Sequence, residues 1–212
     1  MKIPITVTLP LLALTHLSQS QAVFIFHDGN DSLGNTGAAF TGSEGQTQTT
    51  VDGMTLTSEA FIDGVSTGTD LYGTNSGSFG VDNPDTNSSG NDDNDRIDNL
   101  GGLESMVFSF NSAGTFQSID LRFVEETANE AQLIFDGGSS YELNSTTALS
   151  GEDDFAINES FSAGQLITLQ LSGSAAAGEN FSLESVTVVP EPATFALATG
   201  TLMISLVLLK RR

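Results

Sequence analysis

An acidic stretch near the middle of the chain carries the densest set of side chains that could bind a metal. Four aspartates and three asparagines fall within nine residues: Asn91, Asp92, Asp93, Asn94, Asp95, Asp98 and Asn99. Carboxylate and amide oxygens are the hard ligands that Ca²⁺ prefers. The order differs from an EF-hand loop, because position six counted from Asp93 is Asp98, where that loop needs Gly. Asp and Asn are also common turn residues, so two interpretations stay open: a calcium site at Asp92, Asp93, Asp95 and Asp98, and a solvated turn.

Candidates for catalysis are few. Between residues 23 and 189 the chain has one histidine, His27, and neither Cys nor Lys, which excludes thiol and amine nucleophiles. No Gly-x-Ser-x-Gly elbow is present, and a serine hydrolase would need a histidine partner. Two carboxylates about 5 to 10 Å apart would suit a glycosidase, but Trp is absent and the only tyrosines are Tyr72 and Tyr141. We predict a protein that is not an enzyme and requires no cofactor; the alternative is a secreted polysaccharide-active enzyme.

The charge of the central part excludes several classes of partner. Four of the six basic residues lie at the two ends of the chain, which leaves Arg96 and Arg122 against 26 acidic residues between residues 23 and 189, a formal charge of −24. Nucleic acids and anionic membrane surfaces are bound by clusters of Lys and Arg. We therefore expect no nucleic-acid partner, and we expect solubility and attraction for divalent cations instead.

The N-terminus has the pattern of a secretory signal peptide. A single cation at Lys2 precedes a mostly apolar stretch over residues 3–17, and Ser20-Gln21-Ala22 places small residues three and one before a cleavage point. The pattern predicts export and cleavage after Ala22. The competing interpretation is an ordinary buried N-terminal segment.

The C-terminus has the pattern of a short membrane span. Residues 193–209 carry no charge, and as a helix they would extend over about 25 Å, at the short end of what crosses a bilayer. Lys210, Arg211 and Arg212 follow at once and would stay on the cytoplasmic side. These residues predict a transmembrane helix with the body facing outward, and a buried core helix is the competing interpretation.

The tail also carries a motif in front of this span. Val189-Pro190-Glu191-Pro192-Ala193-Thr194, followed by the apolar run and the final Lys-Arg-Arg, resembles the tail of PEP-CTERM proteins of Gram-negative bacteria. The resemblance implies that Pro190, Glu191 and Pro192 form a sorting signal cut by an exosortase-like membrane protease, and that the protein accompanies extracellular polysaccharide or biofilm. A rigid spacer before a permanent membrane anchor is the alternative, since X-Pro pairs commonly delimit helices.

Between the two ends, alternation of apolar and polar residues predicts β-strands. Ile119, Leu121 and Phe123 share one face of a half-buried strand, and the same period recurs at 106–110, 167–171 and 181–183. The phase then shifts toward Val186 and Val188, which predicts a bulge near residues 184 and 185. A hairpin is expected at 137–138 and a turn at 162–165.

These patterns predict a mainly β protein with three parts. The parts are a signal peptide (1–22), an exported antiparallel β-sandwich of jelly-roll style (23–188) with Phe as the main core residue, and a sorting tail with a transmembrane helix (189–212). Long surface loops are expected in the N-terminal half. The expected function is a non-catalytic structural or binding component of an extracellular polysaccharide layer. The protein would be anchored in the inner membrane before processing and would then lie at the cell surface or in the matrix, where shared divalent cations could bridge it to anionic polymer.

Overall fold

The computed structural model describes residues 20–26, 38–39, 48–67, 71–74, 78–81, 96–99, 102–122, 131–144, 152–173 and 180–191, which form strands joined by turns. The strands are β1 (Ala22–Ile25), β2 (Ala38–Ala39), β3 (Gln48–Val51), β4 (Met54–Ile62), β5 (Val65–Ser66), β6 (Leu71–Thr74), β7 (Ser78–Val81), β8 (Ile97–Asp98), β9 (Glu104–Phe110), β10 (Gly114–Arg122), β11 (Ala131–Phe135), β12 (Ser140–Leu143), β13 (Glu152–Phe161), β14 (Ile167–Leu171) and β15 (Asn180–Pro190). Within these ranges there is no helix, and hence none long and apolar enough to span a membrane.

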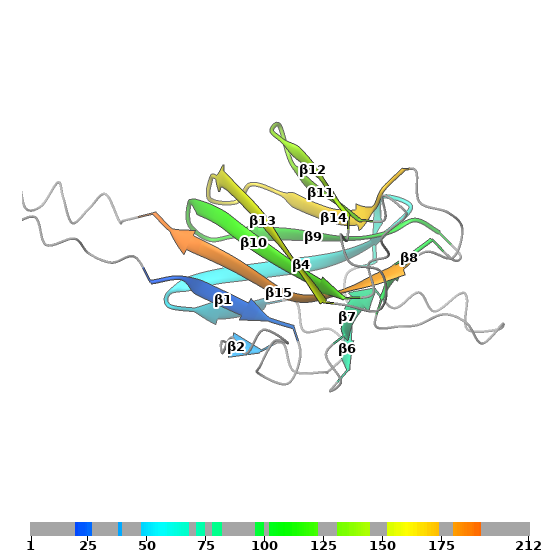
Figure 1. The fold of residues 1–212 in the computed structure, drawn as a ribbon, viewed down its shortest axis with the longest axis horizontal. Helices are drawn as coiled ribbons and strands as arrows, with labels where there is room; N and C mark the ends of the chain where they lie inside the picture. The colour runs from blue at the N-terminus through cyan, green and yellow to red at the C-terminus, as the bar shows by residue number, and fades with distance from the viewer. Residues whose placement is uncertain are drawn as a thin grey trace, which may run out of the picture.

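The strands belong mainly to two sheets (Figure 1). Sheet 1 has the order β13-β10-β15-β1-β2, and β8 also pairs with β15. Sheet 2 has the order β12-β11-β14-β9-β4-β3, and β5 also pairs with β4, whereas β6 and β7 form a separate pair. All pairs are antiparallel except β1 with β2. The prediction of a mainly β body with antiparallel sheets is confirmed for the described residues.

Phenylalanine rings fill the space between the two sheets. Phe24 of sheet 1 lies 5.7 Å, centroid to centroid, from Phe110 of sheet 2, and Phe161 of sheet 1 lies 4.7 Å from the same ring. Phe116 of sheet 1 contacts Phe135 of sheet 2 edge to face at 5.7 Å. Each buried ring contributes about 1.5–3 kcal/mol through removal from water. The prediction that Phe is the main core residue is confirmed, because the eight largest fully buried side chains are all Phe.

The predicted turns are present. In the β11–β12 hairpin the Phe135 amide donates to the Ser139 carbonyl at 2.9 Å, and Gly137 has a φ of 69°. Such a left-handed conformation favours Gly, since other side chains clash there. Between β13 and β14 the Gln165 amide donates to the Ser162 carbonyl at 3.1 Å. Local turn chemistry was therefore enough to place both connections.

The predicted bulge in β15 is also present. Asp120 of β10 lies opposite Ser185, but the next residue, Leu121, lies opposite Leu183, so Glu184 is the extra residue. The expectation of a half-buried strand with a polar outer side is only partly correct for β10. Leu121 and Ile119 are buried as predicted, but Asp120, on the opposite side of the strand, is only 1% exposed. A strand's own alternation does not reveal what its neighbours do on its outer side.

Candidate functional site

The predicted calcium ligands fall on two sides of the boundary of the described chain. Asp98 is the second residue of β8, pairs with Asn180 of β15, and is only 1% exposed. Asp92, Asp93 and Asp95 lie outside the described residues. The structure thus places residues 96–99, the C-terminal end of the acidic segment, which we call its foot. The Asp98 side chain is buried there.

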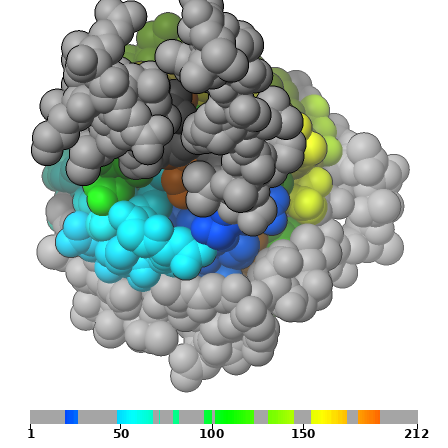
Figure 2. Space-filling view, turned by 90° about the vertical axis from the view of Figure 1, so that its left-hand side faces the viewer, coloured from blue at the N-terminus to red at the C-terminus, as the bar shows by residue number. Residues whose placement is uncertain are grey.

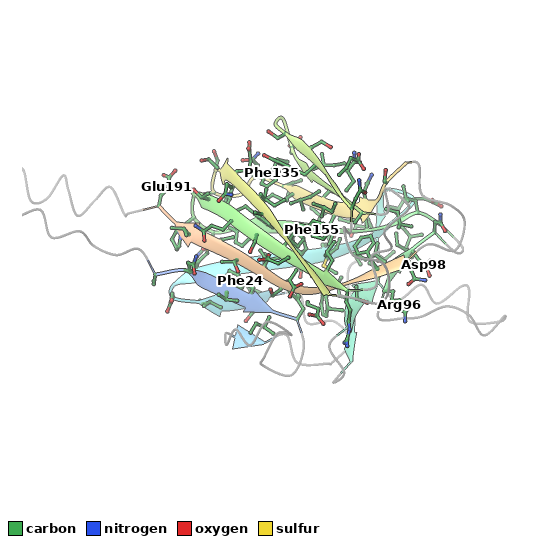
Figure 3. All side chains as sticks on the ribbon, in the orientation of Figure 1. Phe24, Arg96, Asp98, Phe135, Phe155 and Glu191 are labelled. Atoms are coloured by element: carbon green, nitrogen blue, oxygen red, sulfur yellow. The ribbon has the colours of Figure 1, made fainter. Side chains whose placement is uncertain are left out.

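Arg96, near the C-terminal end of the acidic segment, is hydrogen-bonded to β7 and β15. The Val81 amide at the end of β7 donates to the Arg96 carbonyl at 3.0 Å, and Arg96 Nη1 donates to Asn180 Oδ1 at 2.7 Å. A Cβ atom on Gly80 would lie 2.3 Å from the Arg96 backbone, so only Gly permits this approach. One of the two cations of the central part therefore fixes the foot of the segment to β15 (Figure 3).

Two further carboxylates accept backbone hydrogen bonds at the same end of the molecule. Glu104 Oε2 accepts from the Asp98 amide at 3.0 Å, and Asp63 Oδ1 accepts from the Leu103 amide at 2.9 Å. Sequence reasoning missed Glu104, which is fully buried. Its signal was available, because Glu104 continues the inward period of Met106 and Phe108 by one more step. Both carboxylates hold the chain on either side of residues 99–102.

This cluster does not by itself form a metal centre. Among the described residues, no group of three or more His, Asp or Glu side chains is placed to hold a metal ion. The carboxylates of Glu104 and Asp63 already accept amide hydrogen bonds. Calcium binding at Asp92, Asp93, Asp95 and Asp98 remains a prediction.

The first two residues of the predicted sorting motif, Pro190 and Glu191, lie at the opposite end of β15. Pro190 is the last residue of that strand, and the Glu191 amide donates to the Ala113 carbonyl at 3.0 Å. β15 has 11 residues, so Pro190 and Asn180 are separated by about 33 Å at the usual strand rise. Figure 3 shows Glu191 and Asp98 at opposite ends of the molecule.

The N-terminal strand lies beside the C-terminal part of β15. Ala22, the predicted last residue of the signal peptide, is the first residue of β1, is fully buried, and pairs with Val188. Figure 2 views this end, where β1 in blue lies close to β15 in orange. Pro192, Lys210, Arg211 and Arg212, together with the predicted transmembrane helix, lie outside the described residues.

The outer face of sheet 1 carries charged side chains. Asp120 lies opposite Asp154 of β13 in the register, and Arg122 Nη1 lies 3.6 Å from Glu184 Oε1. The bulge in β15 places Glu184 next to Arg122. We call Asp120, Arg122, Asp154 and Glu184 the charged face. It contains the second of the two cations of the central part, and this cation also has a structural contact.

Among the described residues, the outer face of sheet 2 is almost free of charge. Its residues alternate with the buried core positions of the same strands, and we call them the neutral face: Gln48, Thr50, Thr55, Thr57, Glu59, Phe61, Ser105, Val107, Ser109, Gln132, Ile134, Ser140, Glu142, Thr168 and Gln170. Only two are ionisable, and both carboxylates accept hydrogen bonds: Glu142 from Gln132 Nε2 at 2.7 Å, and Glu59 from Ser66 Oγ. The alternation of Thr168 and Gln170 was visible in the sequence, but their cross-strand neighbours were not.

A small cluster links the open edges of the two sheets. Tyr141 Oη of β12 donates to Glu159 Oε2 of β13 at 2.7 Å, and Ser139 Oγ donates to Glu159 Oε1 at 3.0 Å. The hydrogen bond to Glu159, followed by burial, raises the pKa of Tyr141 above its usual value of 10.0. A tyrosine held protonated in this way supports a joint between sheets rather than proton transfer near neutral pH. His27, the only histidine of the central part, lies outside the described residues.

Comparison of the chain with family models, curated proteins and solved structures found no match in any of the three.

Proposed function

We propose that this chain is an exported, non-catalytic surface or matrix protein with a C-terminal sorting signal. In this proposal residues 23–188 form a β-sandwich of jelly-roll style, and residues 189–212 form the sorting motif, a transmembrane helix and a basic cytoplasmic end. An exosortase-like membrane protease processes the tail after the chain is anchored in the inner membrane. The body then serves as a structural or binding component of an extracellular polysaccharide layer.

The placement of the two chain ends is the observation that supports this proposal best. β1 begins beside the end of β15, and Asp98 pairs with the start of β15 about 33 Å away. A tail anchored after Glu191 would therefore leave the foot of the acidic segment on the side away from the membrane. A domain of this form presents its distal end and the outer face of sheet 2 to the extracellular space.

Composition supports the same proposal. A charge of −24 between residues 23 and 189 favours solubility outside the cell and attracts divalent cations. Ca²⁺ bound at Asp92, Asp93, Asp95 and Asp98 could bridge the protein to acidic polymer, because a divalent ion accepts oxygen ligands from both.

Co-sedimentation tests the matrix function. The full chain, kept soluble with a mild detergent, is mixed with extracellular polysaccharide from the producing bacterium, first with CaCl₂ and then with EDTA. We expect the protein to sediment with the polymer. Loss of binding with EDTA would assign the interaction to bridging cations. If the protein stays in the supernatant in both conditions, the matrix function is wrong.

The intact mass of the mature protein tests the sorting function. Protein recovered from the cell surface should lack the residues after the motif, including Arg212. A recovered mass that still includes Arg212 would instead identify a permanently anchored surface protein, and the processing part of the proposal would be wrong.

A further inference from the structure

The neutral face contains a row of four directly opposed residues, of which three have polar side chains and the last is Phe61. Gln132 of β11 lies opposite Gln170 of β14, which lies opposite Ser105 of β9, which lies opposite Phe61 of β4. Residues directly opposite one another in a sheet point to the same side. The row therefore crosses four strands, and at the usual strand separation it extends over about 14 Å.

We propose that this face binds an uncharged polysaccharide chain. This inference rests on the proposed matrix function and specifies the surface and the chemical class of the polymer. Amide and hydroxyl groups both donate and accept hydrogen bonds, as sugar hydroxyls do. Gln170 supplies one such amide, and Gln132 supplies its Oε1 as an acceptor, because its Nε2 already donates to Glu142 and Ser140. Ser105, between Gln170 and Phe61, is only 7% exposed, so its hydroxyl is mostly covered.

Apolar side chains lie directly beside the polar row. Phe61, at its end, is partly exposed on the outer face. In the next row, Ile134 and Val107 each lie opposite Thr168 and are also partly exposed. A sugar ring has polar edges and apolar C–H faces, so a surface on which polar side chains lie next to Phe61, Ile134 and Val107 matches both. The ring of Phe61 provides a flat apolar surface for such a contact.

Charge selects the uncharged polymer over the alternatives. An acidic polysaccharide would be repelled by the 26 carboxylates of the central part unless cations bridged the two. A basic partner would find most of those carboxylates elsewhere, including three on the charged face, and only Glu59 and Glu142 on the neutral face. A neutral polyhydroxylated chain is not repelled by these carboxylates, and it can form hydrogen bonds with the polar side chains of the row.

The test separates the polysaccharide by charge. Extracellular polysaccharide from the producing bacterium is divided by anion exchange into uncharged and acidic fractions, and the full chain is sedimented with each. We expect binding to the uncharged fraction in EDTA. The variant Gln132→Ala/Gln170→Ala/Phe61→Ala should bind at least about tenfold more weakly than the wild type. If this triple variant does not fold, the double variant Gln132→Ala/Gln170→Ala replaces it in the test and should also bind more weakly than the wild type. The matched control is Ser118→Ala/Thr187→Ala on the outer side of sheet 1, which should bind like the wild type.

Three results would overturn the inference. Binding to the acidic fraction alone would show that this face does not select a neutral polymer, although the proposed matrix function would stand. Equal loss of binding in the neutral-face variants and in the control would show that the effect is not local to this face. Absence of binding to both fractions would overturn this inference and the matrix function together. Thermal unfolding of each variant verifies that the protein is folded.

Discussion

The two outer faces of this molecule use polar residues in opposite ways. On the charged face, Arg122 lies 3.6 Å from a glutamate that is only 2% exposed, so the ionic group is part of the packed structure. On the neutral face, amides and hydroxyls such as those of Gln170 and Thr168 are partly exposed and do not pack into the core. The negative formal charge of the chain is therefore reflected in the residues of the charged face, whereas the neutral face has few ionisable residues.

The difference arises from the pairing of the strands. In sheet 1 the bulge at Glu184 inserts one residue between Leu183 and Ser185 opposite β10, so the side chains of β15 change phase against their neighbour. In the described strand pairs of sheet 2 the register runs without a shift. Regular pairing keeps every second residue on the outer face, where most of the polar side chains are partly or fully exposed.

Removal of Arg122 should have the largest effect on stability. Arg122→Ala leaves the Glu184 carboxylate buried without the nearby guanidinium. Breaking a fully buried ion pair costs about 3–5 kcal/mol, and the partial exposure of Arg122 reduces this, so we expect a loss of about 2–3 kcal/mol in the free energy of unfolding. Urea denaturation measures it. The matched change on the other face, Gln170→Ala, should stay within about 0.5 kcal/mol.

A double variant makes this prediction sharper. Replacing both partners by apolar residues of similar size, Arg122→Met/Glu184→Leu, removes the buried charge together with its counterion. Such replacements are often neutral or stabilising, so the double variant should be closer to the wild type than Arg122→Ala. If Arg122→Ala costs no more than Gln170→Ala, the distinction between the two faces is wrong.

Removing the hydrogen bond between Tyr141 and Glu159, which links the two sheets, should have a smaller effect on the free energy of unfolding. The size of this effect should change at high pH. Tyr141→Phe removes the hydrogen bond to Glu159 and should cost about 1 kcal/mol at neutral pH. Because the pKa of Tyr141 is raised in the folded state, its stabilisation is fully present below its unfolded value of 10.0 and is lost as the pH rises through the folded value. The stability difference between the wild type and Tyr141→Phe should therefore shrink above pH 10.0.

Unfolding curves at several alkaline pH values measure this difference. Ser139→Ala serves as the control, because it removes the other hydrogen bond to Glu159 and keeps the tyrosine hydroxyl. It should retain the alkaline loss of stability. A difference between wild type and Tyr141→Phe that is constant across the alkaline range would contradict the role of this hydroxyl.

The sequence was sufficient wherever the determinants are local. The hairpin at Gly137, the turn at 162–165 and the bulge at Glu184 were all predictable, because each depends on residues within a few positions of one another. The inward period of β9 would also have led to Glu104. What the sequence could not reveal is register between distant strands: nothing local places Gln132 beside Gln170, or Arg122 beside Glu184.

The same limit applies to the candidate site. The acidic composition around Asp98 was evident, but its burial at the foot of the segment depends on pairing with Asn180, 82 positions later, and on the contact between the Asp98 amide and Glu104. The neutral face was invisible for the same reason, since it exists only after six strands from four separate stretches of the chain are aligned. A group of residues within one strand can be predicted from the sequence, whereas a group of residues aligned across several strands cannot.

Changing the charge of the neutral face should have the smallest effect on stability. Gln170→Lys and Gln170→Glu place opposite charges at one position of the row, opposite Gln132 and Ser105. In a body of charge −24 the lysine variant should be the more stable of the two, by less than about 1 kcal/mol. The gap should close in 1 M NaCl, where the Debye length is about 3 Å. A gap that persists in salt would mean that Gln170 has a specific structural contact, and this position would then belong with Arg122 rather than with an exposed binding surface.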